Sequence, residues 1–335
     1  MCKCSVIGVA VVGTVVTDIM EMWLVIVMVI MMMSAESCLV RMRLYHQYLS
    51  YISPDSDEAY LQNTTAKEPP LHQEQTCGKS QSLSPNRILG GHAVSYGQYP
   101  WTAILSISGP ATDTLCSGSL VSQEHVLSAA HCVQEKGIQV RIVLGELDYM
   151  DRLEGQEIMQ FKARKIHLHP KYRRIEGKDN QAPKYDLAIL LLDRPVLSSS
   201  MIILICLPPP GLHLNKNTSG TVAGWGRIGQ TSSSPASSIL QAATVPILSR
   251  DECVHQPGAS MPSVDQLCAG VSGDKQGPCP GDSGGPLMVP QQGGNGWILV
   301  GVVSHGPQIC GLTPVIYSSV SHSMDWISKV VGSPL

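Results

Sequence analysis

Gly281-Asp282-Ser283-Gly284-Gly285-Pro286 is the stretch of this sequence that says most about its fold. A serine hydroxyl becomes an effective nucleophile only when a base within hydrogen-bond reach takes its proton. The flanking glycines let the backbone turn tightly and let a substrate carbonyl approach Ser283. The amides of Gly281 and Ser283 can then stabilise a developing oxyanion. The stretch predicts Ser283 as a nucleophile if the chain also supplies a base.

Two upstream segments offer that base and a group to orient it. His131 lies among small residues in Leu-Ser-Ala-Ala-His-Cys, residues 127–132. Asp186 heads Asp-Leu-Ala-Ile-Leu-Leu-Leu, residues 186–192, and a carboxylate beside a run that reads as buried needs a partner. Each signal alone has an ordinary explanation: a chance glycine-serine string, a core or surface histidine, and a turn aspartate. Their combination predicts a nucleophile, base and orienting carboxylate.

The composition favours a turn-rich β protein and excludes a broad basic surface. The 335 residues are 43% hydrophobic and 15% charged, with 31 Gly, 23 Pro and a single Phe. A net charge of -3 and no evident Lys/Arg cluster argue against a nucleic-acid partner. Short β-rich runs at residues 101–107, 140–144 and 297–303 lie between turn signals, which is typical of a barrel or sandwich.

The chain has 11 cysteines, and their spacing favours disulfides over zinc ligands. Beyond residue 4 none forms a CxxC pair, which disfavours a zinc finger or ribbon. Disulfides persist in oxidising compartments. We therefore expect a secreted, extracellular protein.

The first 87 residues are typical of targeting and processing sequence. Met22–Met33 is an unbroken apolar run followed by small polar residues, typical of a signal peptide and shorter than the ~20 residues that span a bilayer. We assign residues 1–37 to a signal peptide and 38–87 to a propeptide or linker, with an uncleaved anchor carrying an extracellular domain as the alternative. Asn63 and Asn217 lie in glycosylation sequons, which matter if the chain is secreted.

Taken in order, His131, Asp186 and Ser283 with their flanking motifs resemble the trypsin/chymotrypsin family of serine proteases. Matching segments run from Ile88 to the C-terminus, so we place one domain at residues 88–335. The resemblance implies an all-β fold of two packed six-stranded antiparallel β-barrels, with the triad between them. At the end of the chain, apolar residues recur at helical spacing and predict a C-terminal helix on the last barrel: Val320, Met324, Ile327 and Val331.

Arg87-Ile88-Leu89-Gly90-Gly91 resembles the activation site of that family. The resemblance implies that cleavage after Arg87 frees the Ile88 amine, which pairs with Asp282 and orders the oxyanion loop. The precursor is then nearly inactive. The implied partners are a polypeptide substrate, an activating protease and protein protease inhibitors.

Similarity to the family also suggests four disulfides, which leave Cys38 unassigned. The implied pairs are Cys77–Cys206, Cys116–Cys132, Cys253–Cys268 and Cys279–Cys310.

In the family, an Asp six residues before the nucleophile selects Lys or Arg, whereas this chain has Gly277 there. Gly306 and Val315 are implied as walls of the same specificity pocket, and Ser304 matches a residue that bonds the triad Asp and the substrate backbone. Burying an unpaired cationic side chain is costly. We therefore expect small or medium aliphatic residues before the scissile bond, with a larger apolar residue as the second choice.

His305 stands where a Trp is common, and Pro280 precedes the oxyanion glycine. These departures leave an alternative: a protease-like binding or regulatory protein with little catalytic activity. No cofactor is required by the triad chemistry.

Two weaker signals concern metals. The loop from Glu146 to Glu157 resembles a calcium loop, although acidic loops are often merely solvated. His167 and His169 lack a third ligand, so we interpret them as ordinary surface histidines.

Overall fold

The computed structural model describes the following residues: 77–80, 92–110, 113–151, 157–174, 182–197, 199–209, 212, 214, 218–229, 234–256, 262–270, 277–292, 296–306 and 310–332. All of them belong to one compact unit, Gln73–Leu335. Outside the described residues lie the predicted signal peptide, Cys38, the two sequons at Asn63 and Asn217, and the cleavage site at Arg87 and Ile88. Among the described helices, none is long and apolar enough to cross a membrane.

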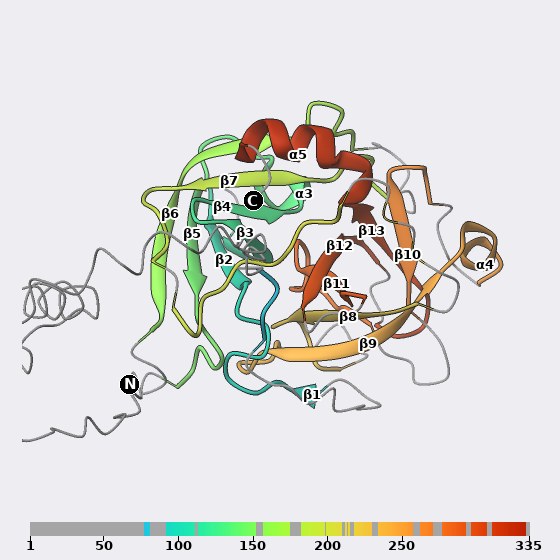
Figure 1. Ribbon diagram of the computed structural model, residues 1–335, viewed down its shortest axis with the longest axis horizontal. Helices are drawn as coiled ribbons and strands as arrows, with labels where there is room; N and C mark the ends of the chain where they lie inside the picture. The colour runs from blue at the N-terminus through green and yellow to red at the C-terminus, as the bar shows by residue number, and fades with distance from the viewer. Residues whose placement is uncertain are drawn as a thin grey trace, which may run out of the picture. The chain divides into compact units, whose positions relative to one another are not determined.

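Six antiparallel strands close the first barrel in the order β2-β3-β4-β7-β6-β5 (Figure 1). The strands are β2 Thr102–Ser108, β3 Asp113–Ser122, β4 His125–Ser128, β5 Gln139–Leu144, β6 Met159–Leu168 and β7 Ala188–Leu192. Strand β5 shows why this sequence forms a barrel, because Val140, Ile142 and Leu144 are buried at alternate positions. The β runs predicted at residues 101–107 and 140–144 are confirmed within one residue at each end.

A second closed barrel follows in the chain. Its strands are β8 Ser219–Gly224, β9 Gln241–Leu248, β10 Gln266–Ala269, β11 Pro286–Pro290, β12 Trp297–His305 and β13 Val315–Ser319. They pair in the order β9-β10-β13-β12-β11-β8, and pairing of β8 with β9 closes the ring. The short strand β1, His92–Ala93, adds to the outside of β9. The predicted all-β fold with two six-stranded barrels is confirmed.

The two barrels meet across a continuous apolar core. Trp101, a fully buried residue just before β2, donates its indole N–H to the sulfur of Met288 on β11 at 2.9 Å. A backbone hydrogen bond also joins the two barrels, because Ser117 N on β3 donates to Ser283 O at 2.7 Å. The segment that carries Ser283 is therefore attached to the first barrel as well as the second.

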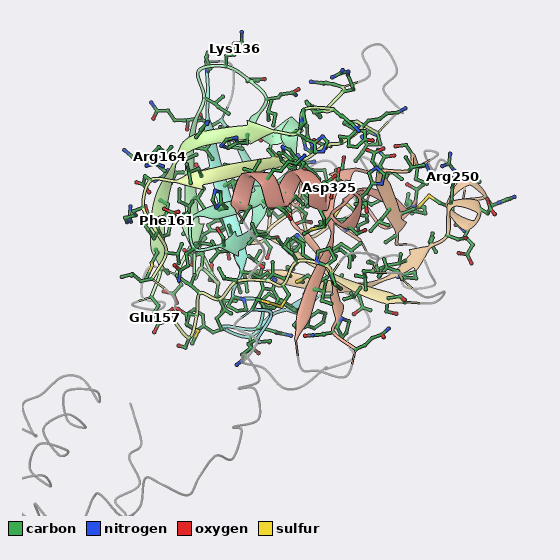
Figure 2. The ribbon with its side chains drawn as sticks, turned by 45° about the horizontal axis from the view of Figure 1, so that its top comes forward. Lys136, Glu157, Phe161, Arg164, Arg250 and Asp325 are labelled. Atoms are coloured by element: carbon green, nitrogen blue, oxygen red, sulfur yellow. A yellow bond between two sulfur atoms is a disulfide. The ribbon has the colours of Figure 1, made fainter. Side chains whose placement is uncertain are left out.

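The described helices are short: α3 Ala130–Val133, α4 Arg250–Val254, the 3-10 turn η1 Ser321–Ser323 and α5 Met324–Val331. The predicted C-terminal helix is confirmed, and Asp325 marks it in Figure 2. Its expected place on the last barrel is wrong in part. Figure 1 shows α5 alongside β7. The ring of Trp326 packs edge-on against the ring of His169 in the first barrel, with 4.7 Å between the ring centroids. The helix thus ties the end of the chain back to the first barrel.

All four disulfides implied by the family resemblance are present. They join Cys77 to Cys206, Cys116 to Cys132, Cys253 to Cys268, and Cys279 to Cys310.

Candidate active site

The buried carboxylate of Asp186 is the anchor of the site. It lies two residues before β7, is 0% exposed, and accepts three hydrogen bonds. Two come from His131, whose backbone N reaches Oδ1 at 2.8 Å and whose ring Nδ1 reaches Oδ2 at 2.7 Å. The third comes from Ser304 Oγ to Oδ2 at 2.6 Å. With Nδ1 committed to a carboxylate, His131 has Nε2 left to accept a proton.

His131 is held by the local chain. Strand β4 ends at Ser128, and α3 begins at Ala130, so the ring projects from the first turn of a short helix. Burial alone would lower the pKa of His131, but the negative charge of Asp186 and its hydrogen bond outweigh burial and raise the pKa above its ordinary value. Arg174 opposes that rise. The imidazole is therefore a somewhat stronger base than a free histidine.

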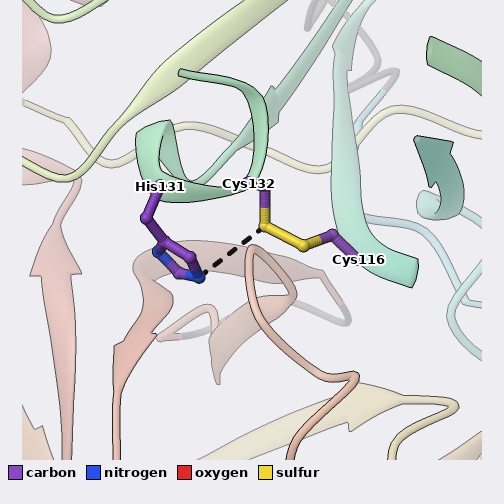
Figure 3. A group of neighbouring side chains, drawn as sticks. All are labelled: Cys116, His131 and Cys132. Atoms are coloured by element: carbon purple, nitrogen blue, oxygen red, sulfur yellow. Dashed lines mark hydrogen bonds between the residues drawn. A yellow bond between two sulfur atoms is a disulfide. The ribbon is translucent and has the colours of Figure 1, made fainter. Parts of the chain in front are cut away.

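Ser283 and His131 meet at the Cys116–Cys132 disulfide. The sulfur of Cys132 lies 3.8 Å from His131 Nε2 (Figure 3). The same sulfur lies 3.9 Å from the backbone O of Ser283. Within the described residues no hydrogen bond joins Ser283 Oγ to His131 Nε2. Catalytic hydrogen bonds of this kind often tighten only when substrate is bound.

Cys116, Cys132 and His131 form a compact group of possible metal ligands, with their ligand atoms within 4.8 Å of one another. Its two sulfurs are bonded to each other, and a metal is held by thiolates. The group therefore offers one nitrogen donor and is a poor metal site.

The Ser283 segment forms a turn with two backbone amides free. Gly281 has φ +104° and Gly284 φ +80°, conformations that favour glycine. The amides of Asp282, Gly284 and Gly285 donate to backbone carbonyls. Those of Gly281 and Ser283 have no protein acceptor in the part of the chain that the structure describes. The two free donors are those that the sequence predicted for the oxyanion.

The carboxylate of Asp282 is held by backbone amides of the second half of the chain. Its carboxylate accepts from Gly226 N at 2.7 Å and from Cys279 N at 2.8 Å. Burial raises its pKa to about 6, although the two amide donors lower it. The carboxyl lines a cavity of about 300 Å³, together with residues of β8, β9, 226–229 and 277–279. A space of this size beside an acidic group is suited to a cationic occupant.

Two of the predicted pocket residues, Gly306 and Val315, lie close together. A Cβ added to Gly306 would come within 3.1 Å of Val315 Cγ2, so these two residues face each other closely. Gly277 lines the cavity that contains Asp282, and a Cβ added there would meet nothing within 4 Å. His305, next to Gly306, is partly exposed. The pKa of His305 lies below its ordinary value, mainly because of burial and to a smaller extent because of the nearby charge of His131.

One sequence prediction near the site is wrong, and one contact of the site was not predicted. His169 is buried at 6% exposure, so its interpretation as a surface histidine is wrong, whereas His167 lies on β6 and is partly exposed. Ser318, not singled out in the sequence, donates to the backbone O of Asp186 at 3.0 Å. No local signal marks Ser318, because its contact depends on the position of β13.

A family model named Trypsin matches residues 88–327. This chain belongs to the trypsin family. Curated relatives of this trypsin-family chain include CLIP domain-containing serine protease B4 of Anopheles gambiae, 31% identical over 72% of the chain and 69% of the relative. Vitamin K-dependent protein C of Mus musculus is 37% identical over 75% of the chain and 53% of the relative. Serine protease filzig of Drosophila melanogaster is 31% identical over 76% of the chain, which spans 15% of that relative.

Family membership agrees with the geometry. The trypsin-family chain is a serine-type endopeptidase, a hydrolase whose substrates are polypeptides. The names of these relatives do not support the alternative of a protease-like binding or regulatory protein.

Proposed function

We propose that this chain is the precursor of a secreted endopeptidase in which His131, Asp186 and Ser283 act as the catalytic triad. The observation that carries the proposal is the buried Asp186 carboxylate, which binds both the backbone and ring nitrogens of His131. A disulfide sulfur contacted by both His131 and Ser283 supports their joint action.

In the proposed mechanism, Ser283 Oγ forms a bond to the scissile carbonyl carbon while its proton passes to His131 Nε2. The amides of Gly281 and Ser283 bind the resulting oxyanion. The C–N bond then breaks, and His131 gives its proton to the leaving amine. Water, activated by the same imidazole, hydrolyses the acyl-enzyme and restores Ser283. Throughout, the Asp186 carboxylate orients the His131 ring and stabilises its protonated form.

Activation follows from the environment of Asp282. We propose that an activating protease cleaves after Arg87 and that the freed Ile88 ammonium enters the 300 Å³ cavity to pair with Asp282. Support comes from the raised pKa of this partly buried carboxyl, because a cation at that place removes the cost of its ionisation. Protein protease inhibitors would bind the matured site.

The proposed preference is for small or medium aliphatic residues before the scissile bond. Val315 narrows the space opposite Gly306, and Gly277 supplies no anion for a Lys or Arg side chain. A larger apolar residue is the second choice, because a glycine at position 277 adds no side chain to the floor of the proposed pocket.

Secretion and calcium binding are the remaining proposals. Four disulfides support an oxidising compartment. At the predicted calcium loop, Glu157 has a buried carboxylate oxygen, Oε2, with no hydrogen-bond partner. A Cβ on Gly145, the neighbour of Glu146, would lie 2.9 Å from the backbone O of Glu157, so the two ends of the loop are adjacent. Oxygen donors in this arrangement suit Ca²⁺, whose role would be structural.

The deciding experiment cleaves the chain after Arg87, exposes it to a serine-directed organophosphate and then offers a peptide library. We expect labelling of Ser283 in the cleaved protein, little in the precursor and none in Ser283→Ala. A cleaved protein that stays unlabelled would overturn the catalytic proposal. Turnover only after Lys or Arg would overturn the specificity proposal alone.

A further inference from the structure

Tyr185, the residue before the triad carboxylate, has an uncommon backbone conformation. Its φ is +48°, and among the described residues it is the single non-glycine with a positive φ. A bulky L-residue is disfavoured there because its Cβ crowds the neighbouring carbonyl. Such a conformation persists only where the surroundings impose it, and it turns the following residue in a defined direction.

A buried carboxylate from the other barrel imposes it. Tyr185 N donates to Asp265 Oδ2 at 2.6 Å, although the two residues are 80 apart in the chain. Asp265 is 2% exposed, and Ser263 Oγ donates to its other oxygen, Oδ1, at 2.5 Å. The backbone O of Asp265 in turn accepts from Ser319 N on β13 at 2.9 Å. Both ends of Asp265 are thus fixed to the second barrel.

Aromatic packing fixes the side chain of Tyr185. The ring of His169 stacks on the Tyr185 ring, with 4.8 Å between the ring centroids and an interplanar angle of 14°. Trp326 packs against the same imidazole. Burial, with Lys171 nearby, lowers the pKa of His169 to about 4, so the stacked ring is neutral at pH 7. Its Nδ1 accepts from Lys171 N at 3.2 Å. The Tyr185 ring therefore cannot follow a rotation of its backbone without breaking this stack.

The peptide that joins Tyr185 to Asp186 is consequently held on both sides by the second barrel. Asp265 holds the amide before it, and Ser318 Oγ holds the carbonyl of Asp186 after it. Between these two points the Asp186 side chain reaches His131.

We propose that Asp265 is a positioning residue, which holds Tyr185 at positive φ through its amide and thereby directs the Asp186 carboxylate toward His131. The proposal rests on the proposed function for its kinetic consequence, but the geometry of the His131–Asp186 bond can be tested without catalysis.

The first test uses the full chain with Ser283→Ala and measures the low-field NMR resonance of the His131 Nδ1 proton. Asp265→Ala should shift or broaden that resonance, whereas Asp265→Asn should retain it. Asparagine keeps an oxygen for Tyr185 N, and its amide can donate to Ser263 Oγ, which is both donor and acceptor. An unchanged resonance in folded Asp265→Ala would overturn the proposal, whatever the activity of the parent protein.

Kinetics of the cleaved protein give the second test. Because small misplacements of catalytic groups cost up to about 100-fold in rate, Asp265→Ala should lower kcat about 10- to 100-fold and leave KM within about two-fold. Asp265→Asn should restore most of the loss. If Asp265→Ala does not fold, Ser263→Ala replaces it, with a smaller fall in kcat expected.

Gln266→Ala is the control for general loosening of the same loop, because Gln266 Nε2 donates to Pro183 O at 2.8 Å and its Oε1 accepts from Ser263 N at 2.8 Å, but neither bond involves Tyr185 N. Its kcat should fall less than that of Asp265→Ala. An equal fall in Gln266→Ala and Asp265→Ala, or parental kcat in folded Asp265→Ala or Ser263→Ala, would contradict the assignment. A parent protein that is not labelled at Ser283 would contradict the proposed function, and the NMR result would still decide the positioning role.

Discussion

Gly226 donates its backbone N–H to Asp282 at 2.7 Å, and the same residue leaves no space for a side chain beside that carboxylate. A Cβ at Gly226 would overlap both oxygens of Asp282. The glycine is therefore required by the close approach of a carboxylate to its backbone. Any side chain here would displace the residue that precedes Ser283.

We expect Gly226→Ala to destabilise the protein by about 1–3 kcal/mol, the usual range for overpacking a close-packed site. It should also lower organophosphate labelling of Ser283, because Asp282 and Ser283 share one turn. Denaturant unfolding and labelling rate measure the two effects. Gly277→Ala is the control, since a Cβ there meets nothing within 4 Å, and it should unfold like the parent. Equal stability of both variants would contradict this account.

Asp282 should make the uncleaved precursor less stable as pH rises. Its pKa is raised from 3.8 to about 6, so between these values the folded state holds the proton more tightly than the unfolded state. Stability from this group is present below pH 3.8 and is lost as pH rises through 6, by about 3 kcal/mol.

The measurement compares the precursor with Asp282→Asn, both carrying Arg87→Gln to prevent cleavage. The stability difference between them should change by about that amount between pH 4 and pH 7. A difference independent of pH would show that Asp282 titrates normally.

Asp186→Asn should change the pH–rate profile as well as the rate. Activity requires neutral His131, and Asp186 raises the pKa of that ring. Removing the charge should move the acidic limb of kcat/KM to lower pH and reduce kcat by roughly 10⁴-fold. Ser304→Ala keeps the charge and loses one hydrogen bond, so its acidic limb should move less. If the acidic limb of the kcat/KM profile does not move in Asp186→Asn, the proposed pairing of Asp186 with His131 is contradicted.

Val315→Gly should widen the substrate preference. The Val315 side chain lies close to Gly306, so its removal frees space between the proposed pocket walls. A peptide library should show kcat/KM rising for larger apolar residues before the scissile bond, relative to small aliphatic ones. An unchanged ranking would place Val315 outside the pocket.

Calcium removal tests the loop between Glu146 and Glu157. If Ca²⁺ binds the partnerless Glu157 Oε2, a saturating concentration raises Tm, and chelation reverses the rise. Glu157→Gln should lose most of this response and Asp113→Asn, on another strand, should keep it. If Ca²⁺ does not change the Tm of the parent protein, the calcium proposal is contradicted.

Much of the site was predictable because its chemistry is encoded in short, contiguous motifs. His131, Asp186 and Ser283 each lie in a segment whose neighbours reveal the local backbone, and a resemblance supplied the four disulfide pairs. The fold class followed from the same resemblance and from β runs between turn residues.

Contacts between distant segments were not predictable. The bond between Tyr185 and Asp265 depends on the docking of two barrels, and neither residue has a local signal. His169 was misinterpreted for the same reason: its ring packs against Trp326, which belongs to a helix 157 residues later in the chain. A sequence pattern reports the preference of a segment, whereas these positions depend on which segment meets it.

The bond from Ser117 to Ser283 links barrel docking directly to the nucleophile. A folding intermediate with only one barrel formed would lack that bond together with the contacts of Ser304 and Ser318 to Asp186, and would be catalytically silent. Recovery of activity on refolding should therefore lag behind formation of either barrel. In the native protein, the Ser117 amide should exchange its hydrogen with solvent only through openings that separate the barrels, so its exchange rate reports how often the active site comes apart.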